Sequence, residues 1–420
     1  MFKHTFLLTL LFCGAAFAKN WTVDDDGPAD FTSIQEAIQA SEDRDTVLVM
    51  RGTYRENVSF AGKEILVTSS DYDDPTVVAQ TVIEPAIGHA VTFAFNETVL
   101  SRLRGLTIRG GGIYCSKSSP TITLCVIEDC SGVGIEGAND ARPTIDGNTI
   151  RRCTEWGVLS CDGTITGNEI SYNGGGVSRC DGYITDNLIS NNVNSTYGYG
   201  GGLYVCGWVI ERNVIAYNGA SYGGGLGQCS GDVLDNVIVG NRAEYSGGGL
   251  WSCKGNIRGN IIAGNRSFDG GGLDDCRETI INNTIVGNRA VRGGGLNGCS
   301  GVVKNNIVAY NEADDAGGGI YGQTQSSYNV YWGNLGGNFG WDAVAGPGDV
   351  EADPLFALEG YWDANGTGDL DDDFWVDGDY HVKSKAGRWD PNAAVWLKDD
   401  VTSPCVDGGD PASDWKQELW

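Results

Sequence analysis

Apolar side chains recur in this chain with a period of about 23 residues, far from the 3.6 of an amphipathic helix. In the unit from Gly247 to Asn265, GGGLWSCKGNIRGNIIAGN, three short apolar segments follow one another. The first pairs Leu with a Cys three positions later, and the next two pair Ile with an Asn three positions later. This pattern predicts three short strands per unit, each with one apolar side chain turned inward and each ended by a bend.

Close copies of this unit run from residue 158 to residue 311. The cysteine position is occupied by Cys161, Cys180, Cys206, Cys229, Cys253, Cys276 and Cys299. One asparagine position is occupied by Asn168, Asn187, Asn213, Asn236, Asn260, Asn283 and Asn306, and the other by Asn173, Asn192, Asn218, Asn241, Asn265, Asn288 and Asn311. A fixed period of this kind is the signature of a solenoid. We therefore predict an all-β, single-stranded parallel β-helix in which the asparagines form two hydrogen-bonded ladders.

The GGG-apolar and Asn-x-Ile-x-x-Asn units resemble the repeats of right-handed parallel β-helix proteins of the pectate-lyase-like superfamily, in its secreted bacterial form. They resemble the repeats of chlamydial polymorphic membrane proteins more loosely. The resemblance extends over residues 20–411 and implies a right-handed coil. It does not imply one reaction, because this superfamily includes lyases, glycosidases, esterases and adhesins on one scaffold.

The chain divides into four predicted parts. Residues 1–18 have an apolar centre and end in Ala-Phe-Ala, which is typical of a secretory signal peptide, so we expect a secreted protein. Residues 19–82 should form an N-terminal cap and the first coil, with a helix in 31–40 that plugs the open end. Residues 83–334 should form the repeats. Residues 335–420, rich in Trp and Asp, should form an irregular C-terminal cap.

One short match in the cap suggests an esterase. Gly52, Tyr54 and Glu56 fit the Gly-x-Tyr-x-Glu pattern near the start of pectin methylesterases. The catalytic motifs that the esterase family carries further along are absent from this sequence. We therefore interpret residues 52–56 as the beginning of the first coil.

The chain is strongly acidic, with 28 Lys and Arg against 55 Asp and Glu, a formal charge of −27. Loss of Lys3 with the signal peptide would make it −28. Such a charge excludes a basic nucleic-acid-binding surface, and apart from the signal segment no stretch is apolar enough to span a membrane.

Cysteine in an exported protein usually indicates disulfides. Here, however, an odd number of cysteines stacks in one column, where parallel side chains do not favour the disulfide torsion. We expect a mostly reduced, buried column, with some disulfides as the alternative. A metal site is disfavoured because the sequence has no Cys-x-x-Cys motif or Cys/His cluster.

Two outward columns are candidates for binding sugar. Arg242, Arg266 and Arg289 each follow the last asparagine of a coil, so they should stack about 4.8 Å apart. They could pair with nearby acidic side chains or grip the carboxylates of a sugar chain. The second column lies next to the first strand of each coil and mixes aromatic with polar side chains: Tyr204, Trp251, Asp274, Asn297 and Tyr321.

An acidic loop from Asp363 to Asp373 is a candidate calcium site. It spaces oxygen donors at Asp363, Asn365, Thr367, Asp369 and Asp371 around Gly368. An EF-hand would require Glu twelve residues into the loop, where this chain has Phe374. A solvated acidic loop is the alternative to a calcium site.

The favoured function is binding or processing of a polysaccharide, acidic or derived from a cell wall. As an enzyme the protein would be a calcium-dependent, pectate-lyase-like polysaccharide lyase, with a glycoside hydrolase as the weaker alternative. Arg266 and Arg289 would then be the catalytic residues, and Arg242 and the outward column would bind substrate. The alternative is a non-catalytic adhesin or structural carbohydrate-binding solenoid.

Overall fold

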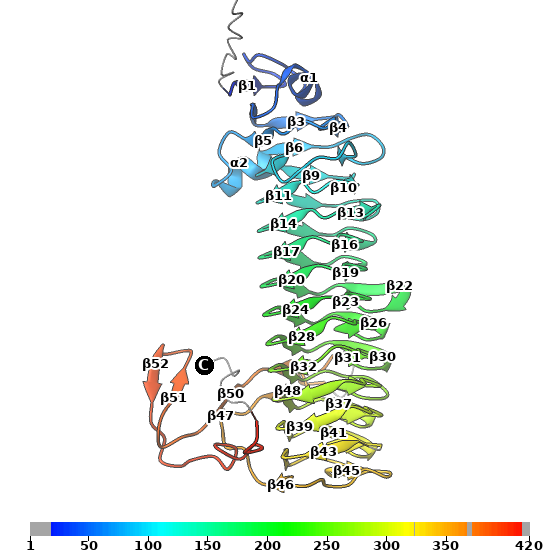
Figure 1. The fold of residues 1–420 in the computed structure, drawn as a ribbon, viewed down its shortest axis with the longest axis vertical. Helices are drawn as coiled ribbons and strands as arrows, with labels where there is room; N and C mark the ends of the chain where they lie inside the picture. Colours follow the sequence, from blue (N-terminus) through cyan, green and yellow to red (C-terminus); the bar gives the residue numbers. More distant parts are fainter. Residues whose placement is uncertain (1–17, 323, 368–371, 414–420) are drawn as a thin grey trace, which may run out of the picture.

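The structure, a computed structural model, describes residues 18–322, 324–367 and 372–413 (Figure 1). Most of them wind into a solenoid with three parallel sheets. Sheet A has 14 strands, from β1 (Asn20–Val23) to β43 (Gln325–Ser327). Sheet B has 14 strands, from β3 (Gly52–Tyr54) to β46 (Val350–Glu351), and sheet C has 13, from β4 (Val58–Ser59) to β45 (Phe339–Gly340). The predicted parallel β-helix is confirmed.

One coil shows how the pattern becomes structure. The coil contains β31 (Leu250–Trp251) in sheet C, β32 (Ile257–Arg258) in sheet A and β33 (Ile261–Ala263) in sheet B. The inward residues Leu250, Ile257 and Ile262 are buried and align with Leu273, Ile280 and Ile285 of the next coil. Their equivalents form one continuous apolar core along the solenoid.

The bends between strands depend on left-handed backbone. In this coil Ser252, Gly259 and Gly264 have φ values of 51°, 70° and 57°. In the GGG run only the first residue, Gly247, has positive φ. The other two glycines are required for space, because a Cβ on Gly248 or Gly249 would lie 2.5 or 2.6 Å from a carbonyl oxygen of the coil below.

The two asparagine ladders are present and satisfy the buried bends. Nδ2 of Asn260 donates to the carbonyl of Val233 at 2.8 Å and to Oδ1 of Asn283 at 3.0 Å. Its own Oδ1 accepts from the backbone N–H of Asn236 at 2.9 Å. Each amide therefore binds the coils on both sides, and backbone groups that a buried bend would leave unpaired are satisfied.

The repeated cysteines stack in the remaining bend, which follows the sheet C strand of each coil. All twelve cysteines of the described chain are free, and eleven of them are buried. Burial raises the pKa of the Cys161 and Cys180 thiols, so these side chains act as small apolar groups. The redox state of the cysteine column stays a prediction.

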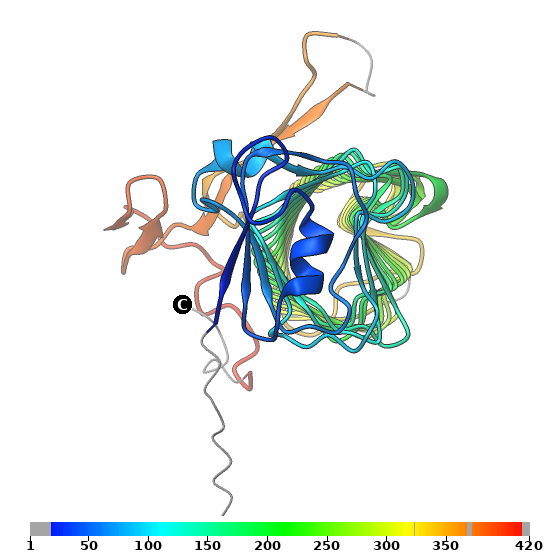
Figure 2. The ribbon, with the colours of Figure 1, turned by 90° about the horizontal axis from the view of Figure 1, so that it is seen from above.

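The helix α1 (Ile34–Ala40) lies across the first coils and, seen from above, over the interior of the solenoid (Figure 2). Its residues Ile34, Ala37 and Ile38 are fully buried in the solenoid core. Glu56, part of the esterase-like match, accepts hydrogen bonds from the Ser33 hydroxyl at 2.7 Å and the Ile34 N–H at 2.8 Å. In this structure Glu56 therefore holds the start of α1.

A second helix, α2 (Pro75–Gln80), begins at its N-cap Asp74 and packs beside sheet B. Neither described helix is long and apolar enough to cross a membrane. The predicted signal segment lies outside the described residues, apart from its last residue.

The C-terminal segment turns back along the solenoid, where it appears in orange and red beside the last coils (Figure 1). It contains β47 (Phe356–Leu358), β48 (Tyr361–Asp363), β49 (Phe374–Val376), β50 (Asp379–Val382), β51 (Arg388–Asp390) and β52 (Val395–Leu397). Phe356, Trp375 and Tyr380 pack on an outward apolar row of sheet B. That row consists of Ala216, Val239, Ala263, Val286 and Ala309.

Trp375 sits where two bends have glycine. A Cβ on Gly264 or Gly287 would lie 2.1 or 2.0 Å from its ring atoms. Trp362 adds a hydrogen bond from Nε1 to the carbonyl of Gly287 at 2.7 Å. The two tryptophans thus fix the segment to the solenoid.

Replacing Asn265 by Ala should lower the free energy of unfolding by roughly 2–4 kcal/mol, because several buried backbone and amide groups lose their partner at once. Asn265 bonds to Ile238 and Asn288 and accepts from Asn241. Urea unfolding followed by circular dichroism measures the change. Leu188→Ala, at a side chain that is 42% exposed, is the control. Equal midpoints for the two variants would contradict a stabilising ladder.

Replacing Trp375 by Ala should detach the C-terminal segment while the coils remain folded, since a buried Trp to Ala change costs about 3–5 kcal/mol. Limited trypsin digestion should then cut faster at Lys383 and Lys385. Trp396→Ala, at a tryptophan that is 72% exposed, is the matched control. If both variants are cut at the wild-type rate, Trp375 does not anchor the segment.

Candidate functional site

The predicted outward column exists on sheet C. It is carried by β23 (Leu203–Tyr204), β27 (Leu226–Gly227), β31, β34 (Leu273–Asp274), β38 (Leu296–Asn297) and β42 (Ile320–Tyr321). In register these strands align Tyr204, Gly227, Trp251, Asp274, Asn297 and Tyr321. Each residue directly follows an inward apolar side chain, so it points away from the core.

A second column, which we did not predict, stands beside the first. Short strands precede the GGG runs, among them β22 (Val193–Tyr199), β26 (Gly219–Tyr222), β30 (Arg242–Ser246), β37 (Arg289–Arg292) and β41 (Glu312–Ala316). In register they align Tyr199, Tyr222, Ser246, Asp269, Arg292 and Ala316. Strands β22, β26 and β30 project at the right-hand edge of the solenoid (Figure 1).

The two columns are adjacent because each coil joins them through one GGG run. A Cβ on the first glycine, for example Gly247 or Gly270, would lie 2.6 Å from the Cβ of the outward residue Trp251 or Asp274. We call the first the sheet C column and the second the arm column.

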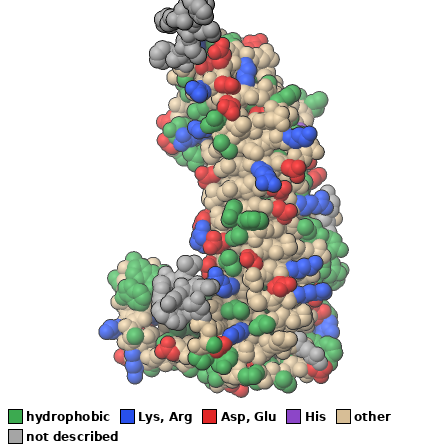
Figure 3. All heavy atoms as spheres, viewed as in Figure 1, with side chains coloured by type: hydrophobic (Ala, Val, Ile, Leu, Met, Phe, Trp, Pro, Cys, Tyr) green, Lys and Arg blue, Asp and Glu red, His purple; other side chains and the backbone are tan. Residues whose placement is uncertain are grey.

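At the N-terminal end of the columns the side chains form an aromatic platform. Tyr199 lies 5.8 Å from Tyr204, 5.4 Å from Tyr222 and 5.7 Å from Trp251, between ring centroids. Tyr222 lies 5.0 Å from Trp251 and 5.3 Å from Tyr245. Hydrophobic side chains gather at this edge of the molecular surface (Figure 3). Rings this close stack on one another, which fixes their orientation.

The platform is partly open to solvent. Tyr199 is 38% exposed and Tyr245 is 48% exposed. Because Gly227 has no side chain, it leaves its place in the sheet C column to the neighbouring rings. The open faces of the rings can therefore receive a flat, partly apolar ligand.

A polar centre follows immediately on the next coils. Nδ2 of Asn297 donates to Oδ1 of Asp274 at 2.6 Å, and Ser246 donates a further hydrogen bond to Asp274. Asp269, at the same level of the arm column, accepts from Nε and Nη2 of Arg292, both at 2.9 Å. Burial, helped by the nearby charges of Asp269 and Asp275, raises the pKa of Asp274 to about 6 although the Asn297 bond opposes the shift.

A second pair of rings lies beyond the polar centre. Tyr321 and Trp341 have ring centroids 5.8 Å apart, and Trp341 is 75% exposed. The hydrogen bond to Asp269 raises the pKa of the Arg292 guanidinium, and the nearby Tyr321 hydroxyl adds to the rise. The carboxyl group with the raised pKa thus has aromatic side chains on both sides along the solenoid axis.

The predicted arginine column also exists. Arg242, Arg266 and Arg289 align through parallel bridges, and Arg242 and Arg266 line a cavity of about 510 Å³ with Phe268 and Val291. Arg289 is bound by Glu312 and Asp373, each at 2.8 Å, and its guanidinium lies over the Trp362 ring at 4.6 Å. Arg289 therefore joins the C-terminal segment to the coils. The catalytic role suggested for Arg266 and Arg289 stays a prediction.

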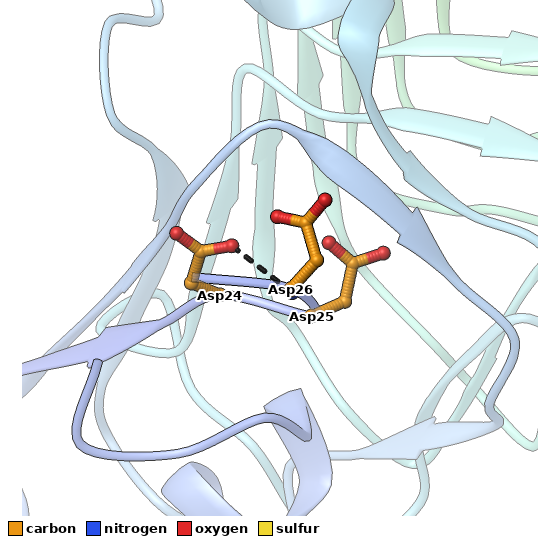
Figure 4. Close-up of side chains that lie close together, drawn as sticks. All are labelled: Asp24, Asp25 and Asp26. Carbon is orange, nitrogen blue, oxygen red and sulfur yellow. Dashed lines mark hydrogen bonds between the residues drawn. The ribbon is translucent and has the colours of Figure 1, made fainter. Parts of the chain in front are cut away.

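The acidic loop connects β48 to β49. Oδ1 of Asp363 accepts from the Asn365 N–H at 2.9 Å, and the Thr367 hydroxyl donates to Asp372 at 2.7 Å. Asp369 and Asp371 lie outside the described residues, so calcium binding here stays a prediction. Within the described chain, Asp24, Asp25 and Asp26 in the loop after β1 form a group of three carboxylates, each with an oxygen within 4.8 Å of the others (Figure 4).

The sequence did carry a signal for the arm column. Each member lies five residues before a member of the sheet C column, across the glycine run. The position of Tyr199 is hidden in the sequence because strand β22 contains extra residues that break the period. In the sequence, Asp269 stands out as one of the acidic neighbours of Arg266 and Arg289, and Arg292 does not stand out.

Comparison with known families covers two parts of the chain. Residues 83–208 match the family model described as "Right handed beta helix region". The chain contains a right-handed β-helix region. The expected resemblance to right-handed parallel β-helix proteins is thereby confirmed. Residues 260–409 match the model described as "Disaggregatase related", which extends from the regular coils into the C-terminal segment.

Two solved structures are similar at low identity. One is titled "The complex structure of XylC with xylose", with 12% identity, a TM-score of 0.38, and coverage of 81% of this chain and 87% of that chain. The other is titled "Geobacillus virus E2 - ORF18", with 14% identity, a TM-score of 0.21, and coverage of 76% of this chain and 56% of that chain. A search of curated proteins gave no match.

The buried position of Asp274 predicts a pH-dependent stability. Its pKa of about 6 lies above the ordinary value of 3.8, so the folded state favours the neutral carboxyl. The resulting stability is present in full below pH 3.8 and is lost as the pH rises through about 6. Relative to Asp274→Asn, the wild type should lose about 2 kcal/mol between pH 4 and pH 7.

Urea midpoints of both proteins at several pH values measure this difference, with Asp314→Asn on an exposed position as the control. A constant difference between wild type and Asp274→Asn across the range would show that the carboxyl is not held neutral.

Proposed function

We propose that this protein binds a polysaccharide along the two outward columns and hydrolyses its glycosidic bonds with Asp274 as the general acid. The observation that carries the proposal is the position of Asp274. It is a buried carboxyl with a raised pKa, placed between the aromatic platform and the Tyr321–Trp341 pair. We further propose that the protein is exported by residues 1–18.

A general acid must be protonated near the working pH and must be able to give up its proton in the transition state. Burial favours the neutral form of Asp274, and the hydrogen bond from Asn297 stabilises the carboxylate that remains after proton transfer. A donor with these properties suits protonation of the oxygen of a departing sugar.

Glycosidases pair such an acid with a second carboxylate. Asp269 is suited to this second role because Arg292 holds it in a two-pronged ion pair. Both carboxyl groups stand on neighbouring columns of the same coil, in environments that differ in burial and charge. Asp269 would act on water or on the sugar carbon itself.

The aromatic side chains would hold the polymer on either side of the cleaved bond. Consecutive coils place equivalent positions about 4.8 Å apart, so the row from Tyr204 to Tyr321, five steps long, extends for roughly 24 Å. The rows follow the solenoid axis, and the polymer would lie along that axis.

Hydrolysis fits these contacts better than the lyase reaction. A lyase needs a basic side chain that can take a proton next to a carboxylate. Arg289 and Arg292, by contrast, each hold carboxylates of the protein. A calcium-dependent lyase reaction remains a separate outcome of the assay.

Purified protein lacking residues 1–18 should release reducing ends from a suitable glycan without the ultraviolet absorbance of unsaturated ends. Asp274→Asn should lower kcat by about 10²–10⁴-fold, as expected when a general acid is removed. Wild-type activity should fall as the pH rises above about 6, because Asp274 then loses its proton. Trp208→Ala, at a tryptophan 63% exposed outside the two columns, should retain wild-type activity.

Unsaturated ends that require calcium would replace the hydrolase proposal with a lyase. Binding without any new ends would support the non-catalytic binding module. Full activity of Asp274→Asn would remove this residue from the reaction.

A further inference from the structure

The charges around the aromatic platform bear on the kind of sugar it can hold. Several carboxyl groups lie there. Glu244 hydrogen-bonds to Tyr245. Asp274 follows Trp251 in the sheet C column, and Asp269 follows Ser246 in the arm column. Asp314 and Asp315 are exposed on the neighbouring strand β41. The whole chain adds a formal charge of −27.

The cations at the polar centre already hold carboxylates of the protein. Arg292 holds Asp269 through two hydrogen bonds of 2.9 Å. Arg277, at the following bend, holds Asp275 through bonds of 3.2 and 3.0 Å. A sugar carboxylate would have to displace an internal partner from either guanidinium, and it would approach through a negative field.

Burial raises the pKa of Tyr204, and the nearby charge of Arg179 opposes the rise; the remaining contacts of the two columns are uncharged. Ring faces of Tyr199, Tyr222 and Trp251 offer apolar area, and Asn297 and Ser246 offer hydrogen bonds beside the reacting carboxyl. Such surfaces bind sugar rings by stacking and by hydrogen bonding to hydroxyl groups, and neither contact needs a charge on the ligand.

We propose that the substrate of the two columns is a neutral glycan, built of uncharged pyranose units, and not a polyuronate. This inference rests on the proposed function and narrows it, because the expectation from sequence also allowed an acidic polymer. The carboxyl groups of the site, and not its shape alone, would discriminate between neutral and acidic glycans, because they repel a ligand of the same charge.

Titration calorimetry with the Asp274→Asn variant, which binds without cleaving, tests the substrate class. The probes are hexasaccharides of neutral sugars (cello-, xylo-, manno- and chito-hexaose) and of uronates (galacturonate, mannuronate and guluronate), each in 1 mM calcium and in chelator. At least one neutral hexasaccharide should bind with an affinity that changes less than twofold between 20 and 300 mM salt. The uronate oligomers should bind at least tenfold more weakly.

Two variants place the binding on the columns. Trp251→Ala should weaken binding of the neutral probe at least tenfold, and Trp208→Ala, on an exposed tryptophan elsewhere, should leave it unchanged. Removing negative charge with Asp269→Asn should improve uronate binding at low salt.

Tighter binding of a uronate than of every neutral probe, with or without calcium, would overturn the inference while leaving a polysaccharide-binding function in place. No binding of any probe at millimolar concentration would overturn the inference and the proposed function together. Neutral binding that is unaffected by Trp251→Ala would show that the site lies elsewhere and would also refute the assignment.

Discussion

The amide ladders in the bends hold the coils between Asn148 and Asn334 in register, and the surface of those coils depends on that register. Each asparagine binds the carbonyl of one neighbouring coil and the amide of the next, so a slip of one residue would break two sets of buried bonds. The ladders do not control the length of chain between rungs. From Asn168 to Asn187 the step is 19 residues, and from Asn187 to Asn213 it is 26. The longer step contains strand β22 and brings Tyr199 to the platform.

The ladders form a rigid frame, and the chain between two ladder asparagines can vary in length and sequence. A solenoid built in this way can carry a specific site on its surface. The frame fixes the spacing along the axis, and the sequence between two ladder asparagines determines which side chains lie on the surface. Tyr222, Ser246, Asp269 and Arg292 occupy equivalent positions of successive coils, yet they form a graded surface that changes from aromatic to acidic to basic. A repetitive fold therefore presents a non-repetitive surface, which is what selective binding of a polymer requires.

The sequence was sufficient to predict the fold because the constraint is periodic. Leu250, Ile257 and Ile262 could be placed inward, and Asn260 and Asn265 could be placed in ladders, from spacing alone. The sheet C column from Tyr204 to Tyr321 followed from the same spacing. The arm column did not, because strand β22 breaks the period and because the short strands before the glycines bury only an alanine, such as Ala243, Ala290 or Ala313, as an apolar marker.

The burial of Asp274 could not be predicted from spacing either. It depends on the arm column and on the close approach of the Gly270 backbone, where an added Cβ would lie 2.6 Å from the Cβ of Asp274. The docking of the C-terminal segment on sheet B could not be predicted from the spacing either. Its only local signal is a row of outward residues on sheet B that changes from Ser171 and Ser190 to Ala216, Val239 and Ala263. An apolar residue on an outward position suggests a covering element but does not identify it.

That covering has a consequence for the order of folding. A solenoid of this kind can add coils one after another as the chain becomes available, because each coil contacts mainly its neighbours. The apolar row on sheet B must nevertheless wait for Trp375 and Tyr380, which are more than a hundred residues later than Ala263. Until these residues are available, the nascent molecule has a correctly wound core, but its outward apolar row on sheet B is exposed to solvent. The last part of the chain thus acts as an intramolecular shield against association with other nascent chains.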